Sequence, residues 1–448
     1  MENGARLGET IRDLLESGRH ERLAQVLEES HAADVAAALR DLPVPEQVTL
    51  FRLLNREQAG GVLAELDDQP LLELVRALDE LEISGILDRM QPDDAAQVLE
   101  ELTDERAEKV LDLMKEEQSE EVQELLEYGE KTAGRIMSLD VLAVQETDTV
   151  GQAIDHVRKA PTAESAHSLY VVDGHEHLVG ALPLRRLITT DPATPVGLLC
   201  QGEVLSVTPE TDQEEVARLV AKYDIVAVPV VDRDRRLLGV ITVDDVIDVI
   251  REEATEDIQR LGGAAGDETV FDPHSAVFPK RLLWRFINLG TAILAASVIG
   301  LFEESIQTLA TLAIFMPIVA SMGGIGTTQT ATVVVRGLAL GDMTAAHLWR
   351  VLKKELLLAL TTGLANAVVM AVIAYLWKGQ ALLAVIIGTA LAINMLVAAT
   401  VGVTIPLALK TFRIDPAIAS SVIITTFTDV CGFFSFLGLA TLLIRFLR

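Results

Sequence analysis

The feature that most constrains this chain is a series of five long apolar stretches in its C-terminal part. Each has about 20 residues or more, which is the length that an α-helix needs to cross a bilayer. Backbone groups inside a bilayer must hydrogen-bond within their own segment, so each stretch is expected to be helical. The sequence therefore predicts an all-α transmembrane domain over residues 280–448, with spans at 282–302, 306–335, 356–377, 381–409 and 417–444.

Charge is distributed unevenly along the chain. Residues 280–448 contain 12 Lys and Arg and 6 Asp and Glu, so residues 1–279 contain the remaining 25 basic and 60 acidic residues. Such an excess of carboxylates repels phosphates, and this disfavours a nucleic-acid partner. The same excess is suited to binding cations.

The basic residues beside the spans predict the orientation in the membrane. With the N-terminus inside, the cytoplasmic flanks carry nine Lys or Arg and the outer flanks carry three, as the positive-inside rule requires. The chain begins MENGARLGET without an apolar signal segment, and its two cysteines exclude a disulfide framework. We therefore expect a multi-pass protein of the plasma (inner) membrane, surrounded by the lipid bilayer, with a cytoplasmic N-terminus.

Composition divides the part before the membrane into three segments. Residues 1–130 carry short amphipathic helix patterns separated by prolines, which predicts an acidic helical N domain. Residues 131–250 contain an internal duplication, whose copies read LYVVDGHEHLVGALPLRRLI from Leu169 and AVPVVDRDRRLLGVITVDDVI from Ala227. Residues 251–279 predict an acidic connecting helix followed by a glycine-rich linker. This segment is interpreted either as a passive link to the membrane domain or as a mechanical connector or plug.

The duplicated pattern resembles a tandem pair of CBS domains, usually a regulatory module. In each copy an aspartate (Asp173 or Asp232) ends one strand and a glycine (Gly180 or Gly239) begins the next. An accidental repeat in an ordinary α/β domain is the alternative. The predicted fold class is multi-domain: an α-helical N-terminal domain, α/β tandem CBS domains and an all-α five-helix transmembrane domain.

One carboxylate lies in the middle of the fifth span. Asp429 is flanked by apolar residues, and a charge at that depth is costly unless it faces water, a partner or an ion. No Lys or Arg lies at comparable depth, so a structural salt bridge is disfavoured. A protonated or hydrogen-bonded Asp and a cation site remain as interpretations. The candidate pore-lining residues near it and in the polar second span are Thr425, Thr426, Gly432, Gly323 and Gly324.

Magnesium fits such a site because Mg²⁺ retains several waters and is often held by only one or two carboxylates. An Asp429 repeated by symmetry in a dimer is able to bind the hydrated ion through water. The TVGYG sequence of potassium filters is absent. The spans contain one Cys and no His near the carboxylate, which argues against copper or zinc.

The segments together resemble the MgtE family of magnesium transporters over essentially the whole chain. Family-like stretches include YGEKTAGRIM from Tyr128, MPIVASMGG from Met316 and DPAIASSVIITTFTDVCG from Asp415. The resemblance implies a homodimer with one pore on its two-fold axis and Asp429 as the ion-binding residue. It also implies regulatory Mg²⁺ sites at the matching carboxylates, each of which also has an interpretation as a solvated surface acid: Asp93, Asp212, Glu214, Asp224, Asp245, Asp248, Glu253, Glu256, Asp257 and Asp415.

Four positions depart from the family pattern. Ile325 stands where the family commonly has Asn, and Val422 stands where it commonly has Pro. Gly61 and Gln97 occupy places where some members have acidic ligands. Ile325 puts in question a pore role for the side-chain amide of the usual Asn, and Val422 puts in question the bend of the fifth span. Gly61 and Gln97 put in question one sensor site of the N domain.

CBS pairs also bind adenine nucleotides in some proteins. The second copy has Thr242 and Asp245 placed as in nucleotide-binding members, whereas the first copy lacks both. ATP is therefore a candidate ligand beside Mg²⁺.

The sequence thus predicts a Mg²⁺-selective, Mg²⁺-gated channel or transporter for passive uptake, and not an enzyme. Cytoplasmic N and CBS domains would sense intracellular Mg²⁺ and close the pore through the helix near residues 245–261. The alternatives are the same architecture passing Co²⁺ or Mn²⁺, and a membrane-anchored CBS sensor without transport. An intramembrane enzyme is disfavoured because the spans contain no nucleophile–base pair or HExxH motif.

Overall fold

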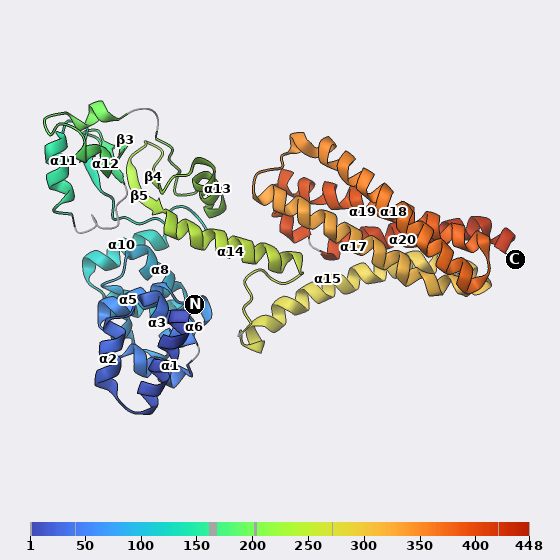
Figure 1. The fold of residues 1–448 in the computed structure, drawn as a ribbon, viewed down its shortest axis with the longest axis horizontal. Coiled ribbons are helices and arrows are strands. Elements are labelled where there is room, and N and C mark those ends of the chain that lie inside the picture. Colours follow the sequence, from blue (N-terminus) through green and yellow to red (C-terminus); the bar gives the residue numbers. More distant parts are fainter. Residues whose placement is uncertain are drawn as a thin grey trace. The chain divides into compact units, whose positions relative to one another are not determined.

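The computed structural model describes residues 2–40, 42–160, 168–200, 204–270, 272–419 and 421–447. The chain separates into two compact units, Met1–Arg251 and Glu252–Arg448 (Figure 1). Their boundary falls within one helix, α14 (Val243–Leu261). The division of the chain at residues 130, 250 and 279 stays a prediction, because compactness separates only these two units.

The first unit begins with short helices, as expected of a helical N domain. Pro45 and Pro92 lie in the first turns of α4 and α8, where a proline removes no intrahelical hydrogen bond. The prolines therefore start helices as well as separating them. The helices are α1 (Glu2–Glu16), α2 (His20–Glu28), α3 (Ala32–Arg40), α4 (Val44–Phe51), α5 (Arg56–Ala64), α6 (Asp68–Ala77), α7 (Glu80–Leu87), α8 (Pro92–Glu100), α9 (Asp104–Leu113) and α10 (Glu116–Leu126).

The duplicated segment forms the expected pair of α/β copies. In the first copy β1 pairs in parallel with β2, and β2 pairs antiparallel with β3. In the second copy β4 pairs antiparallel with β5, and a single parallel bridge between Val207 and Val230 takes the place of β1. The elements are β1 (Ala143–Gln145), α11 (Val150–Val157), β2 (Ser168–Val172), β3 (Leu178–Pro183), α12 (Leu184–Ile188), the 3₁₀ turn η2 (Val196–Leu199), α13 (Gln213–Tyr223), β4 (Ala227–Val231) and β5 (Leu237–Thr242).

The two repeated glycines lie inside β3 and β5, two residues after each strand begins, and not at the strand starts as the sequence predicts. A Cβ on Gly180 would lie 2.4 Å from Sγ of Cys200, and one on Gly239 would lie 2.8 Å from Sδ of Met137. Such distances are too short for any side chain. Glycine is therefore needed in both copies because another segment packs directly on the strand.

The N domain and the second CBS copy share one hydrophobic core. Buried residues of this cluster run from Ile11 in α1 to Val249 in α14, and they include Met137, Val230 and Val246. A continuous core explains why the first 251 residues form one compact unit. It also brings α8 of the N domain against the first turns of α14, which positions the carboxylates described below.

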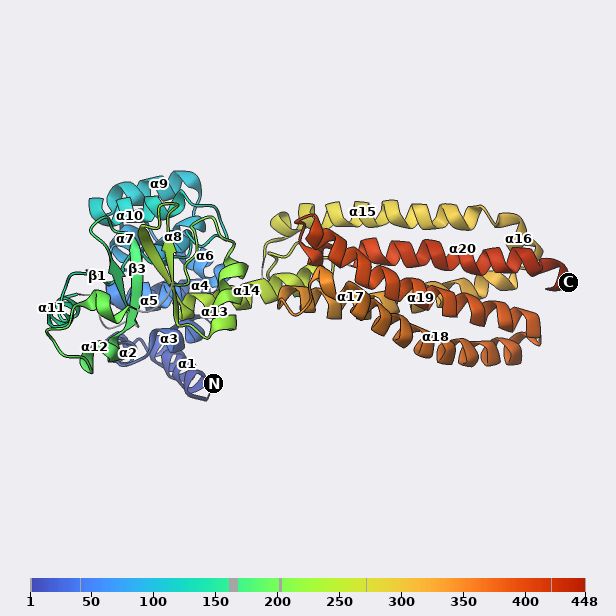
Figure 2. The same cartoon turned by 90° about the horizontal axis from the view of Figure 1, so that it is seen from above.

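The second unit contains five helices, among its described residues, that are long and apolar enough to cross a membrane. Figure 2 shows them as a bundle in which α15 runs beside α20, while α19 packs against α17, α18 and α20. The unit consists of α15 (His274–Gly300), α16 (Glu303–Thr308), α17 (Thr311–Ala339), η3 (Ala345–His347), α18 (Leu348–Lys378), α19 (Ala381–Thr411), η4 (Pro416–Ala419) and α20 (Ser421–Leu447).

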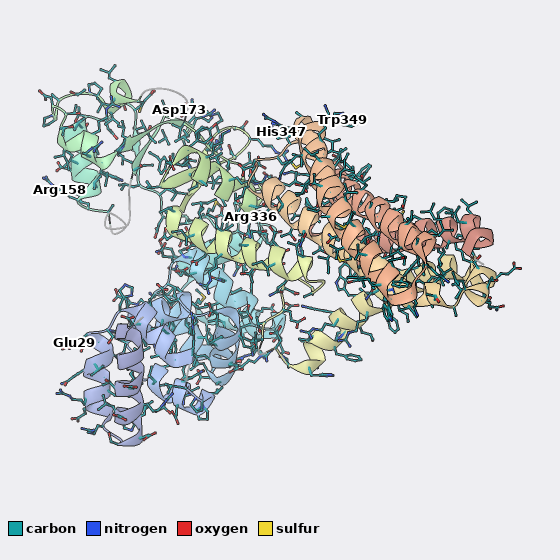
Figure 3. The ribbon with its side chains drawn as sticks, turned by 45° about the vertical axis from the view of Figure 1, so that its right-hand side comes forward. Glu29, Arg158, Asp173, Arg336, His347 and Trp349 are labelled. Atoms are coloured by element: carbon teal, nitrogen blue, oxygen red, sulfur yellow. The ribbon has the colours of Figure 1, made fainter. Side chains whose placement is uncertain are left out.

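The five predicted spans correspond to α15, α17, α18, α19 and α20, so the five-helix prediction is confirmed. The second helix begins later than predicted because the short α16 precedes it. Residue 420, inside the fifth predicted span, lies outside the described residues. Figure 3 shows Arg336, His347 and Trp349 at the same end of the bundle, the end that the charge pattern predicts to be cytoplasmic.

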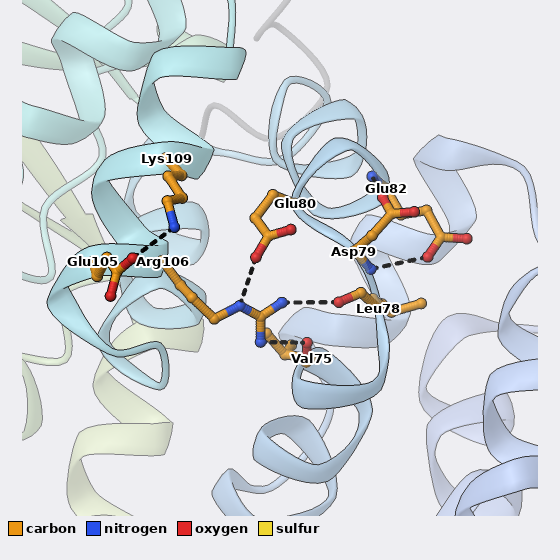
Figure 4. Close-up of polar contacts among 8 residues, drawn as sticks. All are labelled: Val75, Leu78, Asp79, Glu80, Glu82, Glu105, Arg106 and Lys109. Carbon is orange, nitrogen blue, oxygen red and sulfur yellow. Dashed lines mark hydrogen bonds and ion pairs between the residues drawn. The ribbon is translucent and has the colours of Figure 1, made fainter.

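Arg106 ties α9 to the α6–α7 turn (Figure 4). Its guanidinium donates to the carbonyl of Leu78 at 2.8 Å and forms an ion pair with Glu80 at 3.0 Å. The neighbouring pair between Lys109 and Glu105, at 2.7 Å, lies within α9 and is highly exposed. The two basic residues thus differ in whether they connect separate helices.

Replacing Arg106 by Ala is expected to lower the melting temperature of the first unit by about 2–4 °C, the shift typical of losing one net hydrogen bond in a domain of this size. Lys109→Ala is the matched control and should leave it unchanged, because exposed pairs within a helix contribute little. Differential scanning calorimetry of the full chain in detergent measures both. Equal shifts for the two variants would contradict a bracing role for Arg106.

Candidate ion pathway and carboxylate clusters

Asp429 lies in α20, between the buried residues Ile424 and Phe436. Its carboxylate is partly exposed and makes no hydrogen bond or ion pair with any described residue. In the part of the chain that the structure describes, no basic side chain neutralises it, which agrees with the absence of a basic residue at that depth in the sequence. A carboxylate in this position is suited to an ion or to water.

The threonines beside Asp429 direct their hydroxyls to their own helix. Thr426 donates to the carbonyl of Val422 at 2.6 Å, and Thr428 donates to the carbonyl of Thr425 at 2.9 Å. Because a hydroxyl oxygen keeps acceptor capacity after donating, these groups are still able to accept from water. A pore-lining role for Thr425 and Thr426 stays a prediction.

Two of the three glycines predicted in the pore with Asp429 face the interior of the bundle. Gly323 in α17 and Gly432 in α20 are buried, and the Cβ position of each points at the side chain of Asn394 in α19. Gly324 faces Thr425, with 3.6 Å between its Cβ position and Cγ2 of the threonine. Any contact of these three glycines with an ion would therefore be through their backbone.

An open groove of about 720 Å³ runs along one face of α17. Ile325, one of the four predicted departures from the family pattern, lies in this groove and is 52% exposed. Both polar and apolar side chains lie along this face. The residues that line it are Ser321, Gly324, Ile325, Thr328, Gln329, Thr332 and Val333.

Two buried polar side chains in the membrane helices escaped the sequence reasoning. Asn394 in α19 is 0% exposed and Glu355 in α18 is 5% exposed. Glu355 accepts a hydrogen bond from Thr330 at 3.2 Å and pairs with Lys354 at 3.0 Å. Asn394 is a polar residue inside an apolar stretch, the same signal that singled out Asp429, so it was detectable from the sequence. Glu355 follows Lys353 and Lys354 just before the predicted span 356–377, and its burial had no such signal.

A carboxylate cluster lies where α8 packs against the start of α14. Burial and the charges of Asp94 and Asp245 raise the pKa of Asp93 to about 8, and its Oδ1 is buried without a hydrogen-bond partner among the described residues. Burial and the charges of Asp245, Asp244 and Asp248 raise the pKa of Asp94 to about 6. The predicted residues Asp93, Asp245 and Asp248 thus belong to one cluster, to which the structure adds Asp94 and Asp244.

Neighbouring carboxylates as well as burial raise the pKa values of Asp93, Asp94 and Asp245, so the acids of this cluster repel one another. Burial likewise raises the pKa of Asp245 to about 6. No three acidic, His or Cys side chains within the described ranges come close enough to coordinate a bare metal ion. A Mg²⁺ ion that keeps its waters bridges longer gaps than direct coordination allows.

A second cluster, in the other unit, contains four predicted carboxylates and one unforeseen cation. Burial and the charges of Asp415, Glu253 and Glu256 raise the pKa of Asp257 to about 6. Arg260 forms ion pairs with both Glu256 and Asp415, so α14 is bound to the segment that joins α19 to α20. The spacing of Glu256 and Arg260, four residues apart on a helix, was a signal for this pair.

Three further predicted ligands belong to α13 and do not form one site. Asp212 caps its N-terminus by accepting from the amide of Glu214 at 2.8 Å, and Glu214 pairs with Arg218 at 2.9 Å. Asp224, with φ of 51°, ends the same helix. The ends of an 11-residue helix are roughly 16 Å apart, so one ion cannot contact both Asp212 and Asp224 within one chain.

The predicted nucleotide residues are engaged with each other. The hydroxyl of Thr242 donates to Asp245 at 2.8 Å, and the same carboxylate belongs to the cluster with Asp93. A cavity of about 430 Å³ lies elsewhere in the CBS pair and is not lined by either residue; its walls include Leu139, Val141, Gln145, His156 and Leu237. ATP binding at Thr242 and Asp245 stays a prediction.

Three regions of the chain match known families. The MgtE intracellular N domain matches residues 30–131, the CBS domain matches residues 133–192 and 197–252, and MgtE, described as a divalent cation transporter, matches residues 316–439. The chain is 34% identical over 446 residues to the magnesium transporter MgtE of Thermus thermophilus, and the aligned region covers 98% of this chain and 99% of that protein. The magnesium transporter MgtE of Bacillus subtilis is 32% identical over 434 residues, with 96% of each chain covered.

Two solved structures resemble the part of the chain before the membrane helices. One is the soluble part of a magnesium transporter, at 30% identity and a TM-score of 0.52, covering 56% of this chain and 99% of that one. The other is the cytosolic domain of the Mg²⁺ channel MgtE in complex with ATP, at 36% identity and a TM-score of 0.52, covering 54% and 99%.

Five membrane-length helices and the matching transporter region define a multi-pass membrane protein of the divalent cation transporter class. The similarity extends over almost the entire sequence and includes both soluble regions. The chain therefore belongs to the MgtE family of magnesium transporters.

The raised pKa values predict that stability falls as pH rises. A carboxyl whose pKa is about 6 or 8 when folded, but near 3.8 when unfolded, binds more protons in the folded state. Its contribution is complete below the unfolded value and is lost as pH rises through the folded value. Without Mg²⁺, the melting temperature of the first unit should therefore decrease between about pH 4 and pH 8, the range from the unfolded pKa to the highest folded pKa.

Asp93→Asn is expected to flatten this decrease, because the amide needs no proton to remain neutral. The exposed Asp112→Asn removes one acidic group outside the cluster and should keep the wild-type slope. Added Mg²⁺ should stabilise the wild type more at pH 8 than at pH 5.5, because protons compete for the same oxygens. Parallel slopes for the wild type and Asp93→Asn would show that the cluster does not control this pH dependence.

Proposed function

We propose that this protein lets Mg²⁺ enter the cell passively through a pore formed by two copies of the chain, with the N-terminus in the cytoplasm. The observation that carries the proposal is Asp429, a carboxylate inside a membrane helix with no ion pair or hydrogen bond among the described residues. Such a group has a large free-energy cost in a bilayer unless a cation or water reaches it. The family supports the identity of the cation as Mg²⁺.

The dimer accounts for the polar side chains in the groove on α17. Thr328 and Gln329 are exposed on this outward face, and exposure of a glutamine amide to lipid would be unfavourable. Two such faces brought together around a two-fold axis would enclose a path in which these polar groups stand among apolar walls. Mg²⁺ enters down its electrochemical gradient, and the membrane potential supplies about 2.3 kcal/mol per charge per 100 mV.

Selectivity follows from hydration. A single acidic residue from each copy suits an ion that keeps its waters, and Mg²⁺ loses them more reluctantly than Ca²⁺ does. Co²⁺ and Mn²⁺ are the alternative cargoes. A CBS sensor without transport and an intramembrane enzyme are both less consistent with a carboxylate in the middle of a span.

The carboxylate clusters along α14 form the proposed sensor. When Mg²⁺ is scarce, the charges around Asp93 and around Asp257 repel one another or are neutralised by protons. Bound Mg²⁺ would stabilise the arrangement in which these acids are close together, and we propose that this arrangement closes the pore. Arg260 already neutralises Glu256 and Asp415, so it competes with Mg²⁺ at the second cluster.

ATP is a second proposed ligand. The observation that favours it is the 36% identity to a cytosolic domain solved in complex with ATP. In this chain Asp245 would have to serve the nucleotide and the carboxylate cluster at once. ATP and Mg²⁺ binding would therefore be coupled through Asp245.

Asp429→Asn is expected to reduce Mg²⁺ uptake into proteoliposomes at least tenfold, because it keeps the shape of the side chain and removes its charge. Glu304→Gln removes one acid from the exposed α16 and serves as the control, with uptake close to wild type. Fluorescence of a trapped Mg²⁺ indicator measures the initial rate. Absence of uptake by the wild type would exclude transport, whereas normal uptake by Asp429→Asn would exclude only this ion site.

The sensor is tested by two variants with opposite expected effects. Asp415→Asn removes a proposed Mg²⁺ ligand and should raise the Mg²⁺ concentration that protects residues 252–270 from protease. Arg260→Gln removes the competing cation and should lower that concentration, since Glu256 and Asp415 lose their partner. Limited proteolysis over a Mg²⁺ titration compares both with the wild type. Shifts in the same direction would contradict competition between Arg260 and Mg²⁺.

A further inference from the structure

Asn394 presents an unusual unpaired acceptor inside the membrane unit. The side chain is fully buried near the middle of α19. Its Nδ2 donates to the carbonyl of Val319 in α17 at 2.9 Å, whereas its Oδ1 is buried and has no partner among the described residues. A buried acceptor without a donor is unfavourable, so native proteins usually provide a partner such as ordered water.

The surroundings of Asn394 are shaped to its amide. A Cβ on Gly323 would lie 2.2 Å from Nδ2 and 3.2 Å from Oδ1, and a Cβ on Gly432 would lie 2.7 Å and 3.2 Å from the same atoms. Any side chain at either glycine would therefore collide with the amide. Two helices, α17 and α20, leave space for one polar group contributed by a third.

The nearby hydroxyl groups do not supply the missing donor. Thr327 in α17 and Thr428 in α20 are both 0% exposed. The hydroxyl of Thr327 donates to the carbonyl of Gly323, and that of Thr428 donates to the carbonyl of Thr425, each at 2.9 Å. Each hydroxyl has one proton, so neither is left to donate to Oδ1 of Asn394.

The acceptor lies close to the proposed ion site along α20. Gly432, which contacts Asn394, follows Asp429 by three residues, so the two share a helical face and are separated by roughly 4.5 Å along the axis. A divalent ion held at Asp429 through its water shell would carry strongly polarised O–H groups in this region. Such water molecules are the type of donor that Oδ1 lacks.

We propose that Oδ1 of Asn394 accepts a hydrogen bond from a water molecule of the hydrated divalent cation at Asp429, which makes Asn394 a second recognition residue for the ion. This inference rests on the proposed transport function. Asp429 supplies the charge, whereas Asn394 recognises the hydration shell. The bond from Nδ2 to Val319 fixes the orientation of the amide, so that the oxygen is the atom left for water.

The test is the Mg²⁺ concentration dependence of uptake into proteoliposomes for Asn394→Leu and Asn394→Asp. Leucine has a similar size without an acceptor, and it should raise the half-saturating Mg²⁺ concentration about tenfold, while light scattering and the melting temperature show a folded protein. Aspartic acid, which is neutral in a fully buried position, keeps both a donor for the carbonyl of Val319 and an acceptor oxygen, so it should restore half-saturation to within about threefold of the wild type. Ser305→Ala, which removes a hydroxyl bonded to Thr441 at 2.8 Å, is the control for losing a buried polar group.

A purely structural role would lower the maximal rate of Asn394→Leu and leave half-saturation unchanged, and that result would overturn the inference. If the leucine variant does not fold, Asn394→Asp decides: a tenfold rise in half-saturation despite the retained oxygen also overturns it. Either of these results would overturn only the role of Asn394. The proposed transport function would still stand, provided that the wild type conducts Mg²⁺ and Asp429→Asn does not. Failure of the wild type to conduct would instead remove the proposed function itself.

Discussion

Repulsion between carboxylates along α14 is the interaction on which the proposed regulation depends. The start of the helix places Asp244, Asp245 and Asp248 beside α8, and its later part carries Glu253, Glu256 and Asp257. One helix therefore holds acids in both compact units. Since burial and like charges raise several of these pKa values, protons and cations compete for the same oxygens.

The two clusters differ in how their charge is balanced. In the cluster at α8, burial and neighbouring carboxylates raise the pKa of Asp93, and Oδ1 of Asp93 is left without a partner among the described residues. The other cluster includes Arg260, which pairs with Glu256 and Asp415. A cation from solution would neutralise unbalanced negative charge in the first cluster. In the second cluster it would have to displace the guanidinium of Arg260. The two clusters are thus suited to respond over different Mg²⁺ concentrations.

The membrane unit combines close helix packing with a few polar groups. Gly323 and Gly432 allow α17 and α20 to approach the amide of Asn394, and small residues of this kind are how membrane helices bring their backbones together. Glu355 and Thr330 make a second polar contact, between α18 and α17. The proposed ion pathway would therefore depend on a junction of three helices as well as on Asp429.

Several sequence predictions were limited for identifiable reasons. Gly323 and Gly432 were predicted in the pore because they are small and near polar residues, but the direction of a Cβ depends on helix rotation, which hydropathy does not define. Asp212 and Asp224 were given as regulatory ligands by resemblance, and the resemblance did not show that they stand at opposite ends of α13. Asp245 both accepts a hydrogen bond from Thr242 and belongs to the cluster with Asp93. The sequence did not show this, because it depends on contact between α8 and α14.

The sequence by itself determined the five membrane helices, the duplicated CBS pair, the helical N domain and the exceptional position of Asp429. Hydrophobic length, periodicity and the cost of a charge in a bilayer are local properties, so they can be read directly from neighbouring residues. Only the tertiary structure decided which carboxylates share a cluster, that Arg260 lies among them, and that Asn394 fills the space between two glycines. Those features depend on contacts between residues up to 155 positions apart, and such contacts are created by packing and not by local sequence.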